Sequence, residues 1–291
     1  MSALFKLFGV AALVAAMAFP AAAQDAGSPP LAAESAADDD AAPVLDRVPI
    51  RELDLPTLDG VLDLIIVTIG QEQQRWRVAV AQRDCLELIR IANSVGLGHE
   101  MLGEADTVLA EQELQEAYVM RAKAVQARVL AFSLRYRALD QLRACSRFSV
   151  PEEKSGNPRY VRPAPLATAE YTQAAIDLLE AGEVNLASAV ASGVSRKCEP
   201  VRGAAQSIAL FLPYLDEVST ILSERPQAMG PRASRSRLLQ LRSQLTRAAE
   251  ALQRQFGNQC DAESAASEEA APPAEAPDAR KPGASAPGVR S

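Results

Sequence analysis

The sequence has only one histidine, and this scarcity excludes several classes of enzyme. A single imidazole, His99, cannot build the multi-histidine metal sites or the His-paired nucleophiles of many enzymes. Because His99 stands beside Glu100 in a glycine-rich stretch, we expect a surface histidine in a turn between helices, without a partner for acid–base catalysis. The sequence therefore predicts no catalytic residue.

Motifs that hold cofactors or metals are missing as well. There is no Glu-x-x-His pair for a di-iron bundle, no C-x-x-C-H for haem, and neither a G-x-S-x-G elbow nor an S-x-x-K motif. Gly96, Gly98 and Gly103 are spaced somewhat like a phosphate loop, but no strand precedes them and the Lys-Ser/Thr ending is absent. We predict a non-enzymatic protein with no cofactor and no metal.

Strand patterns are nearly absent, and aromatic residues make up only 4% of the chain. Instead, apolar residues from Tyr118 to Leu139 recur at alternating steps of four and three. A second seam of mostly small residues runs beside the first, from Met120 to Ala138. Two adjacent apolar seams are typical of a helix that packs against two neighbours. The fold class is therefore predicted to be all-α.

Glycines and prolines divide the middle of the chain into about five helices. We expect a turn at Gly96–His99 and a proline-rich loop near residues 147–165. The result is an elongated antiparallel helical bundle with disordered termini. The predicted helices cover residues 57–95, 103–146, 166–197, 201–224 and 232–256.

The first 23 residues have the pattern of a secretory signal peptide. Lys6 precedes an apolar run to Phe19, and the small residues Ala21–Ala23 form a cleavage site. No later apolar run is long enough to span a bilayer. We expect cleavage after Ala23 and a periplasmic or secreted protein that does not meet cytosolic nucleic acid.

Two acidic segments rich in Ala and Pro flank the helical region. Residues 24–56 contain eight acids and two bases, and residues 260–291 contain six acids and three bases. Such segments lack the branched and aromatic residues that offset chain entropy. We predict a disordered acidic arm over 24–55, a helical bundle domain over 56–260 and a disordered Pro/Ala/Glu tail over 261–291.

Four cysteines in an exported chain indicate two disulfides with three possible connectivities. The turn expected near residue 229 is the midpoint of Cys198 and Cys260, so an antiparallel hairpin favours that pair. Cys85 and Cys145 lie at different levels of the first predicted hairpin, about 45 Å apart along the axis if both helices are straight. Pairing of Cys85 with Cys198, a bond between chains and free thiols stay open.

Arginine is concentrated on two predicted helices. Residues 117–147 contain seven bases and one acid, whereas residues 100–116 contain six acids and no base. This order complements the helix dipole, and the simplest interpretation is a solvated face. The alternative is a surface that binds anions or partners, or, for the last helix, anionic lipid. The residues concerned are Arg121, Arg128, Arg135, Arg235, Arg242 and Arg247.

These observations favour a scaffold, adaptor or assembly partner in the bacterial cell envelope that acts through helix surfaces. Its partners would be envelope proteins or further copies of itself, with weak contact to anionic lipid. One alternative is a small-ligand or stress-sensing bundle, with a pocket lined by Trp76, Tyr118, Phe132 and Tyr136. Another is an oligomeric periplasmic chaperone.

Overall fold

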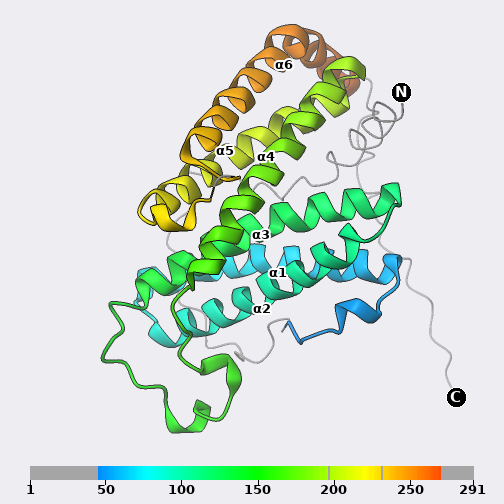
Figure 1. Cartoon of the computed structure of the whole chain (residues 1–291). Helices are drawn as coiled ribbons and strands as arrows, with labels where there is room; N and C mark the ends of the chain where they lie inside the picture. The colour runs from blue at the N-terminus through cyan, green and yellow to red at the C-terminus, as the bar shows by residue number, and fades with distance from the viewer. Residues whose placement is uncertain (1–44, 196, 231, 270–291) are drawn as a thin grey trace, which may run out of the picture.

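A computed structural model describes residues 45–269 of the chain, except for 196 and 231. This part is helical, with short 3-10 turns and no strand, as the sequence predicts, but it has six long helices rather than five. Figure 1 shows them as two groups of three that cross one another. The helices are α1 (Leu55–Gln82), α2 (Cys85–Ala110), α3 (Gln115–Gln141), α4 (Thr168–Ser195), α5 (Cys198–Ser223) and α6 (Arg235–Glu269).

The first predicted helix, 57–95, is wrong because the chain breaks at Arg83 and Asp84. Arg83 adopts a left-handed backbone conformation with φ of 56°, which ends α1. The carboxylate of Asp84 then accepts hydrogen bonds from the backbone N–H groups of Leu86 and Glu87, both at 3.0 Å, and caps α2. A side-chain cap, rather than a glycine or a proline, marks this helix boundary.

The turn predicted at Gly96–His99 is also wrong, since these residues lie in the middle of α2. The break comes later, between Ala110 and Gln115, and it also divides the helix predicted over 103–146. A Cβ atom on Gly98 would lie 3.4 Å from the side chains of Ile65 and Leu45. Glycine here permits close helix packing and does not end the helix.

Helices α1, α2 and α3 enclose one hydrophobic core, and α4, α5 and α6 enclose a second. The three helices predicted for the second half begin and end within a few residues of α4, α5 and α6, except that α6 continues past the predicted end at residue 256. α5 passes through Pro213 without ending. α3 takes part in both cores, because Val125, Val129 and Phe132 face the second bundle.

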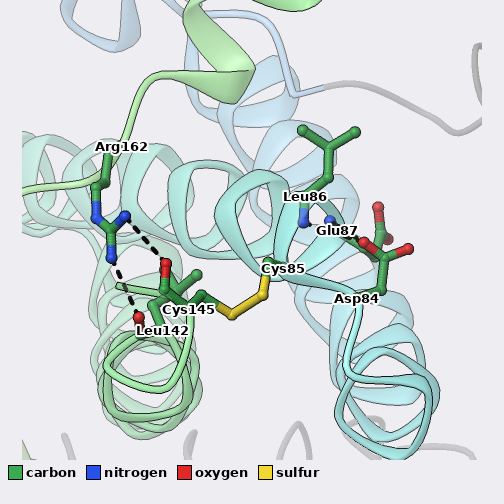
Figure 2. Close-up of a disulfide and its surroundings, with 7 residues drawn as sticks. All are labelled: Asp84, Cys85, Leu86, Glu87, Leu142, Cys145 and Arg162. Carbon is green, nitrogen blue, oxygen red and sulfur yellow. Dashed lines mark hydrogen bonds between the residues drawn. A yellow bond between two sulfur atoms is a disulfide. The ribbon is translucent and has the colours of Figure 1, made fainter. Parts of the chain in front are cut away.

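Each bundle is closed by one disulfide. Cys198 is joined to Cys260, the pair that the hairpin geometry favours, and Cys85 is joined to Cys145. The bond between Cys85 and Cys145 lies within the first bundle. It is possible because the helices predicted over 57–95 and 103–146 are each broken, which removes the expected mismatch along the helix axis. Figure 2 shows Cys85 in the first turn of α2 and Arg162 donating hydrogen bonds to the carbonyl oxygens of Leu142 and Cys145, at 3.2 and 3.3 Å.

The two bundles repeat the same plan. Both ends of α4 lie 113 positions after those of α1 (168 − 55 and 195 − 82). Both ends of α5 lie the same 113 positions after those of α2 (198 − 85 and 223 − 110). A cysteine opens the second helix of each bundle, and the disulfides span 60 and 62 residues. The described residues therefore form two disulfide-closed three-helix bundles in tandem, whose first two helices match in length and spacing.

The boundaries of the predicted arms need correction. Leu45 and Ile50 are buried against the first bundle, so residues 45–54 do not belong to a disordered arm. α6 continues to Glu269, beyond the predicted start of the tail at residue 261. The predicted signal peptide, the rest of the acidic arm and most of the tail lie outside the described residues. Among the helices of the described residues, none combines the length and the apolar composition that a membrane-spanning segment requires.

Candidate functional site

The predicted basic stripe of α3 faces α4 rather than solvent. Arg128 is 5% exposed, and Arg135 is also largely covered. The solvated-face interpretation is therefore wrong for these two residues. The exposure of this face depends on tertiary structure, because α4 crosses α3 (Figure 1) and brings an acid close to each arginine. These acids are Glu170, Asp177 and Glu180.

Arg128 is the centre of this ionic cluster. Its Nη1 donates to Asp106 Oδ2 of α2 at 3.2 Å, and its Nη2 lies 3.2 Å from Asp177 Oδ2 of α4. Arg121 Nε donates to Asp106 Oδ1 at 2.7 Å, and its Nη2 donates to Glu180 Oε2 at 3.3 Å. The two arginines thus tie α2, α3 and α4 together through shared carboxylates.

Arg135 extends the cluster toward the beginning of α4. Its Nη1 donates to Glu170 Oε1 at 2.5 Å, and Glu170 Oε2 accepts from the backbone N–H of Ala167 at 2.7 Å. The guanidinium lies on a small-residue position of α2, where a Cβ atom on Gly96 would be 3.2 Å from Arg135 Nε. Gly103, one heptad later, lies under Arg128. Glycine at these positions gives the arginines room between the helices.

His99 lies between these two glycines and is buried, contrary to the predicted surface turn. Burial, together with the positive charges of Arg128 and Arg135, lowers the pKa of His99 to about 3. The imidazole is therefore neutral at ordinary pH. Its Nε2 atom has no hydrogen-bond partner among the described residues.

Asp177 is the most perturbed carboxyl of the cluster and is 1% exposed. Burial raises its pKa to about 7, although Arg128 and a 2.8 Å hydrogen bond from Gln173 favour the charged form. The contact with Arg128 is an ion pair that leaves Asp177 Oδ2 without a hydrogen bond in the described part of the chain. The carboxyl can therefore take up a proton near neutral pH.

A second network links the bundles beside this cluster. Arg137 of α3 binds Glu217 of α5 through both carboxylate oxygens and lies over the ring of Trp76, 5.5 Å from its centroid. Gln73 donates to the hydroxyl of Tyr214 at 3.3 Å. These contacts and the ionic cluster fix the angle between the bundles. No group of three His, Cys, Asp or Glu residues within the described ranges could hold a metal ion.

The four aromatic residues of the alternative ligand pocket are not brought together. Phe132 packs edge-on against Tyr171 at 5.7 Å in the second core, and Tyr118 is exposed on α3. Tyr136 lines a surface hollow of about 260 Å³ beside the proline-rich loop. A common pocket built from Trp76, Tyr118, Phe132 and Tyr136 is therefore wrong.

The basic face of α6 does stay on the surface. Arg235, Arg242 and Arg247 are exposed, and Arg242 is paired with Asp216 of α5 through hydrogen bonds of 2.5 and 2.9 Å. A groove of about 330 Å³ runs between α5 and α6 at this point. The residues that line it are Asp216, Ser219, Thr220, Ser223, Met229, Arg235, Leu238, Leu239 and Arg242.

Sequence reasoning misses the acidic half of the cluster. Glu170 and Asp177 are seven residues apart, as are Arg128 and Arg135, and this shared spacing could have indicated two facing helices. It also misses the tandem repeat, although Arg-Asp-Cys at 83–85 recurs as Arg-Lys-Cys at 196–198, with the same offset as the helices. Both signals are present in the order of the amino acids alone.

Comparison of the chain with protein-family models, curated proteins and solved structures gives no match. The function must therefore be inferred from the chain's own residues. The features available for this are the ionic cluster between the bundles and the open groove on α5 and α6.

Proposed function

We propose that the protein is an exported, non-enzymatic scaffold or assembly partner of the bacterial cell envelope that binds other proteins through its helix surfaces. One observation carries the proposal, the open groove between α5 and α6. There Leu239 is 58% exposed beside Arg235 and Met229. A groove between two helices that exposes Leu239 beside Met229, with Arg235 at its rim, has the mixed apolar and charged lining that can receive a partner helix.

The rigidity of the chain supports this proposal. Each bundle is closed by a disulfide that stabilises the fold by about 2 to 4 kcal/mol. The charges of the buried cluster are used to hold α2, α3 and α4 at a fixed angle. A rigid body with an open groove is suited to positioning a partner.

The two disulfides are compatible with an oxidising, exported location. Export through the signal sequence at residues 1–23 is part of the proposal. Contact with anionic lipid is less well supported, because Asp216 already neutralises Arg242.

The test uses the full chain produced in its own bacterium and extracted from the cell envelope. We expect the unchanged chain to migrate on a native gel in a complex larger than one molecule. A chain with Arg235→Glu and Leu239→Asp should lose this complex, because the new charges cannot be buried in the interface. Val190→Asp with Val194→Asp is the matched control, since both valines are equally exposed but lie on α4. Migration of the unchanged chain as a single molecule, or equal loss in the control, would contradict the proposal.

The stress-sensing alternative is favoured by a specific observation, the carboxyl of Asp177 between the bundles. Its protonation near pH 7 would leave Arg128 with Asp106 as its remaining anionic partner. In this alternative, the angle between the bundles changes on acidification. Energy transfer between fluorophores on exposed positions of α1 and α6 should then differ between pH 5 and pH 8. Equal transfer at both pH values would exclude it.

A further inference from the structure

We infer that the groove between α5 and α6 binds helix α1 of a second copy of the chain, in the way that α4 lies against α3 within one copy. This inference rests on the proposed function and names the partner. It follows from the tandem repeat, which makes α1 the counterpart of α4 and places the groove at the counterpart of the α3 surface that α4 covers.

Buried positions support the correspondence between α1 and α4. With the offset that relates Leu55 to Thr168, Leu62 corresponds to Ala175 and Ile65 corresponds to Leu178, and all four of these core residues are buried. The buried polar residue Glu72 corresponds to Asn185, which is also buried. The two helices therefore use the same face inside their own bundles.

α6 corresponds to α3 when residue numbers are shifted by 114 positions (238 − 124), one more than the 113 that relates α1 to α4. This offset places the buried core residues 124, 127 and 131 of α3 on the buried residues 238, 241 and 245 of α6. The same shift also fixes which residues correspond on the outer faces of the two helices. Arg121 corresponds to Arg235, Val125 to Leu239 and Arg128 to Arg242. Two arginines and one aliphatic residue are thus retained at equivalent positions.

The difference between the two faces is what covers them. In the first bundle, α4 buries Val125 and Arg128. In the second bundle, no described helix covers Leu239 and Arg242, and the groove stays open there. The α5 and α6 surface therefore has the side chains of a repeat interface but lacks the following repeat.

α1 presents the complementary face. Its Leu64 and Val67 correspond to Asp177 and Glu180, the residues with which α4 contacts α3. Leu64 is 51% exposed and Val67 is 55% exposed. The outer face of a terminal repeat is normally polar, because no neighbour covers it. Exposed aliphatic residues at these positions indicate that α1 packs against another repeat.

The change from acids to aliphatic residues fits the chemistry of the groove. Arg128 shares Asp106 with Arg121 and binds Asp177 as a second acid, whereas Asp216 binds Arg242 through two hydrogen bonds. Leu64 can therefore approach this paired arginine without leaving a charge uncompensated. Leu239 and Met229 offer apolar contact to Leu64 and Val67.

This contact joins two different surfaces, so it is heterologous. Each copy keeps one free groove and one free α1 face, and association continues into a ring or an open chain of copies. The two surfaces can therefore be removed separately, which gives a sharp test.

The test measures the molar mass of the purified full chain, as processed by the cell, by light scattering over roughly a hundredfold range of concentration. The unchanged chain should rise in mass with concentration. Leu64→Gln with Val67→Gln removes the apolar α1 face, and Arg235→Glu with Leu239→Asp removes the groove. Each variant alone should be a monomer, and an equal mixture of the two should form dimers, because each supplies the surface that the other lacks.

Val190→Asp with Val194→Asp is the control and should associate like the unchanged chain. Circular dichroism of each variant checks that it is folded, and Leu239→Gln is a milder replacement if the acids unfold the groove variant. A monomer at every concentration, a surface variant that still associates alone, or a mixture that stays monomeric would overturn the inference. A pure chain that is monomeric but forms a groove-dependent complex in the envelope would overturn it too, while leaving the proposed function intact.

Discussion

Single residues of the buried cluster control how the fold responds to pH. Asp177 and His99 are both desolvated, and burial disfavours the charged form of each. The charged form of Asp177 is the deprotonated carboxylate, so its pKa rises, whereas the charged form of His99 is the protonated imidazolium, so its pKa falls. Arg128 of α3 lies near both groups, Arg135 lies near His99, and Asp106, Gln173 and Glu180 face Asp177. The two groups therefore act on stability over overlapping ranges of pH with opposite sign.

The carboxyl of Asp177 should make the fold less stable as pH rises. Its pKa is about 7 in the folded chain and has an ordinary value of 3.8, so the folded state binds more protons between these values. This contribution is fully present below about pH 4 and is lost as pH rises through 7. The difference in unfolding free energy between the unchanged chain and Asp177→Asn should therefore fall by about 2 to 4 kcal/mol between pH 4 and 8.

Urea unfolding at a series of pH values measures this difference. Asp140→Asn, at an exposed carboxyl near the end of α3, should show no comparable trend. A difference that grows with pH would show that Arg128 keeps Asp177 ionised in the folded chain.

His99 should have the opposite effect. Its pKa is about 3 in the folded chain and 6.5 ordinarily, so the unfolded state binds the additional proton. The stability that this group contributes is present above pH 6.5 and is lost as pH falls toward 3. When the pH is lowered from 7 to 4, the unfolding free energy of His99→Leu should therefore fall by about 2 to 3 kcal/mol less than that of the unchanged chain. Parallel unfolding curves for the two proteins across this range would exclude the assignment.

At the scale of the helices, the sequence predicts an element well where a chain breaker marks its end. Prolines and turn residues near 151–165 and 226–231 isolate α4, α5 and α6, and the same turn leads to the pairing of Cys198 with Cys260. The first half is harder, because Arg83 ends α1 through a left-handed backbone conformation and the side chain of Asp84 caps α2, with no glycine or proline at the boundary. The glycines of α2 mislead because they serve helix packing.

The candidate site shows the same division. Periodicity identifies the arginine stripe of α3, since residues seven apart share a face. Whether that face meets water or another helix depends on how α4 is placed, which is a tertiary property. The wrong solvated-face interpretation of Arg128 and Arg135 comes from judging one helix alone.

Glycine substitutions distinguish packing from helix propensity. Gly182 faces Leu241, whose Cγ atom would lie 3.0 Å from an added Cβ atom, whereas nothing lies near Gly70 in α1. Gly182→Ala should cost about 1 to 3 kcal/mol through overpacking. Gly70→Ala should stabilise the fold by about 0.5 to 1 kcal/mol. Chemical denaturation of both variants checks the opposite signs, and equal effects would contradict the packing of α4 against α6.

At the scale of the whole molecule, the repeated plan connects stability and function. Two bundles, each closed by its own disulfide, meet through α3 and α4, and no described helix covers the corresponding surfaces of α6 and α1. The chain thus contains both a completed repeat interface and the two halves of another one.

The disulfides should contribute separately to the two bundles. Replacing Cys85 and Cys145 by serine should lower the unfolding free energy by about 2 to 4 kcal/mol, because the unfolded chain regains the entropy of an open loop. The Cys198–Cys260 bond should persist in this variant, as peptide mapping without reductant can show. Unchanged stability, or rearrangement of the remaining bond, would contradict two independent closures.

The most direct measurement places a photo-crosslinking amino acid at position 239 in the groove and maps what it captures in the purified chain. We expect a covalent dimer in which the captured peptide belongs to α1 of the other copy and includes the region of Leu64 and Val67. The same crosslinker at Val190, an exposed residue of α4, should give no such adduct. A product confined to one chain, or a dimer joined through any helix other than α1, would show that the second copy does not occupy the groove.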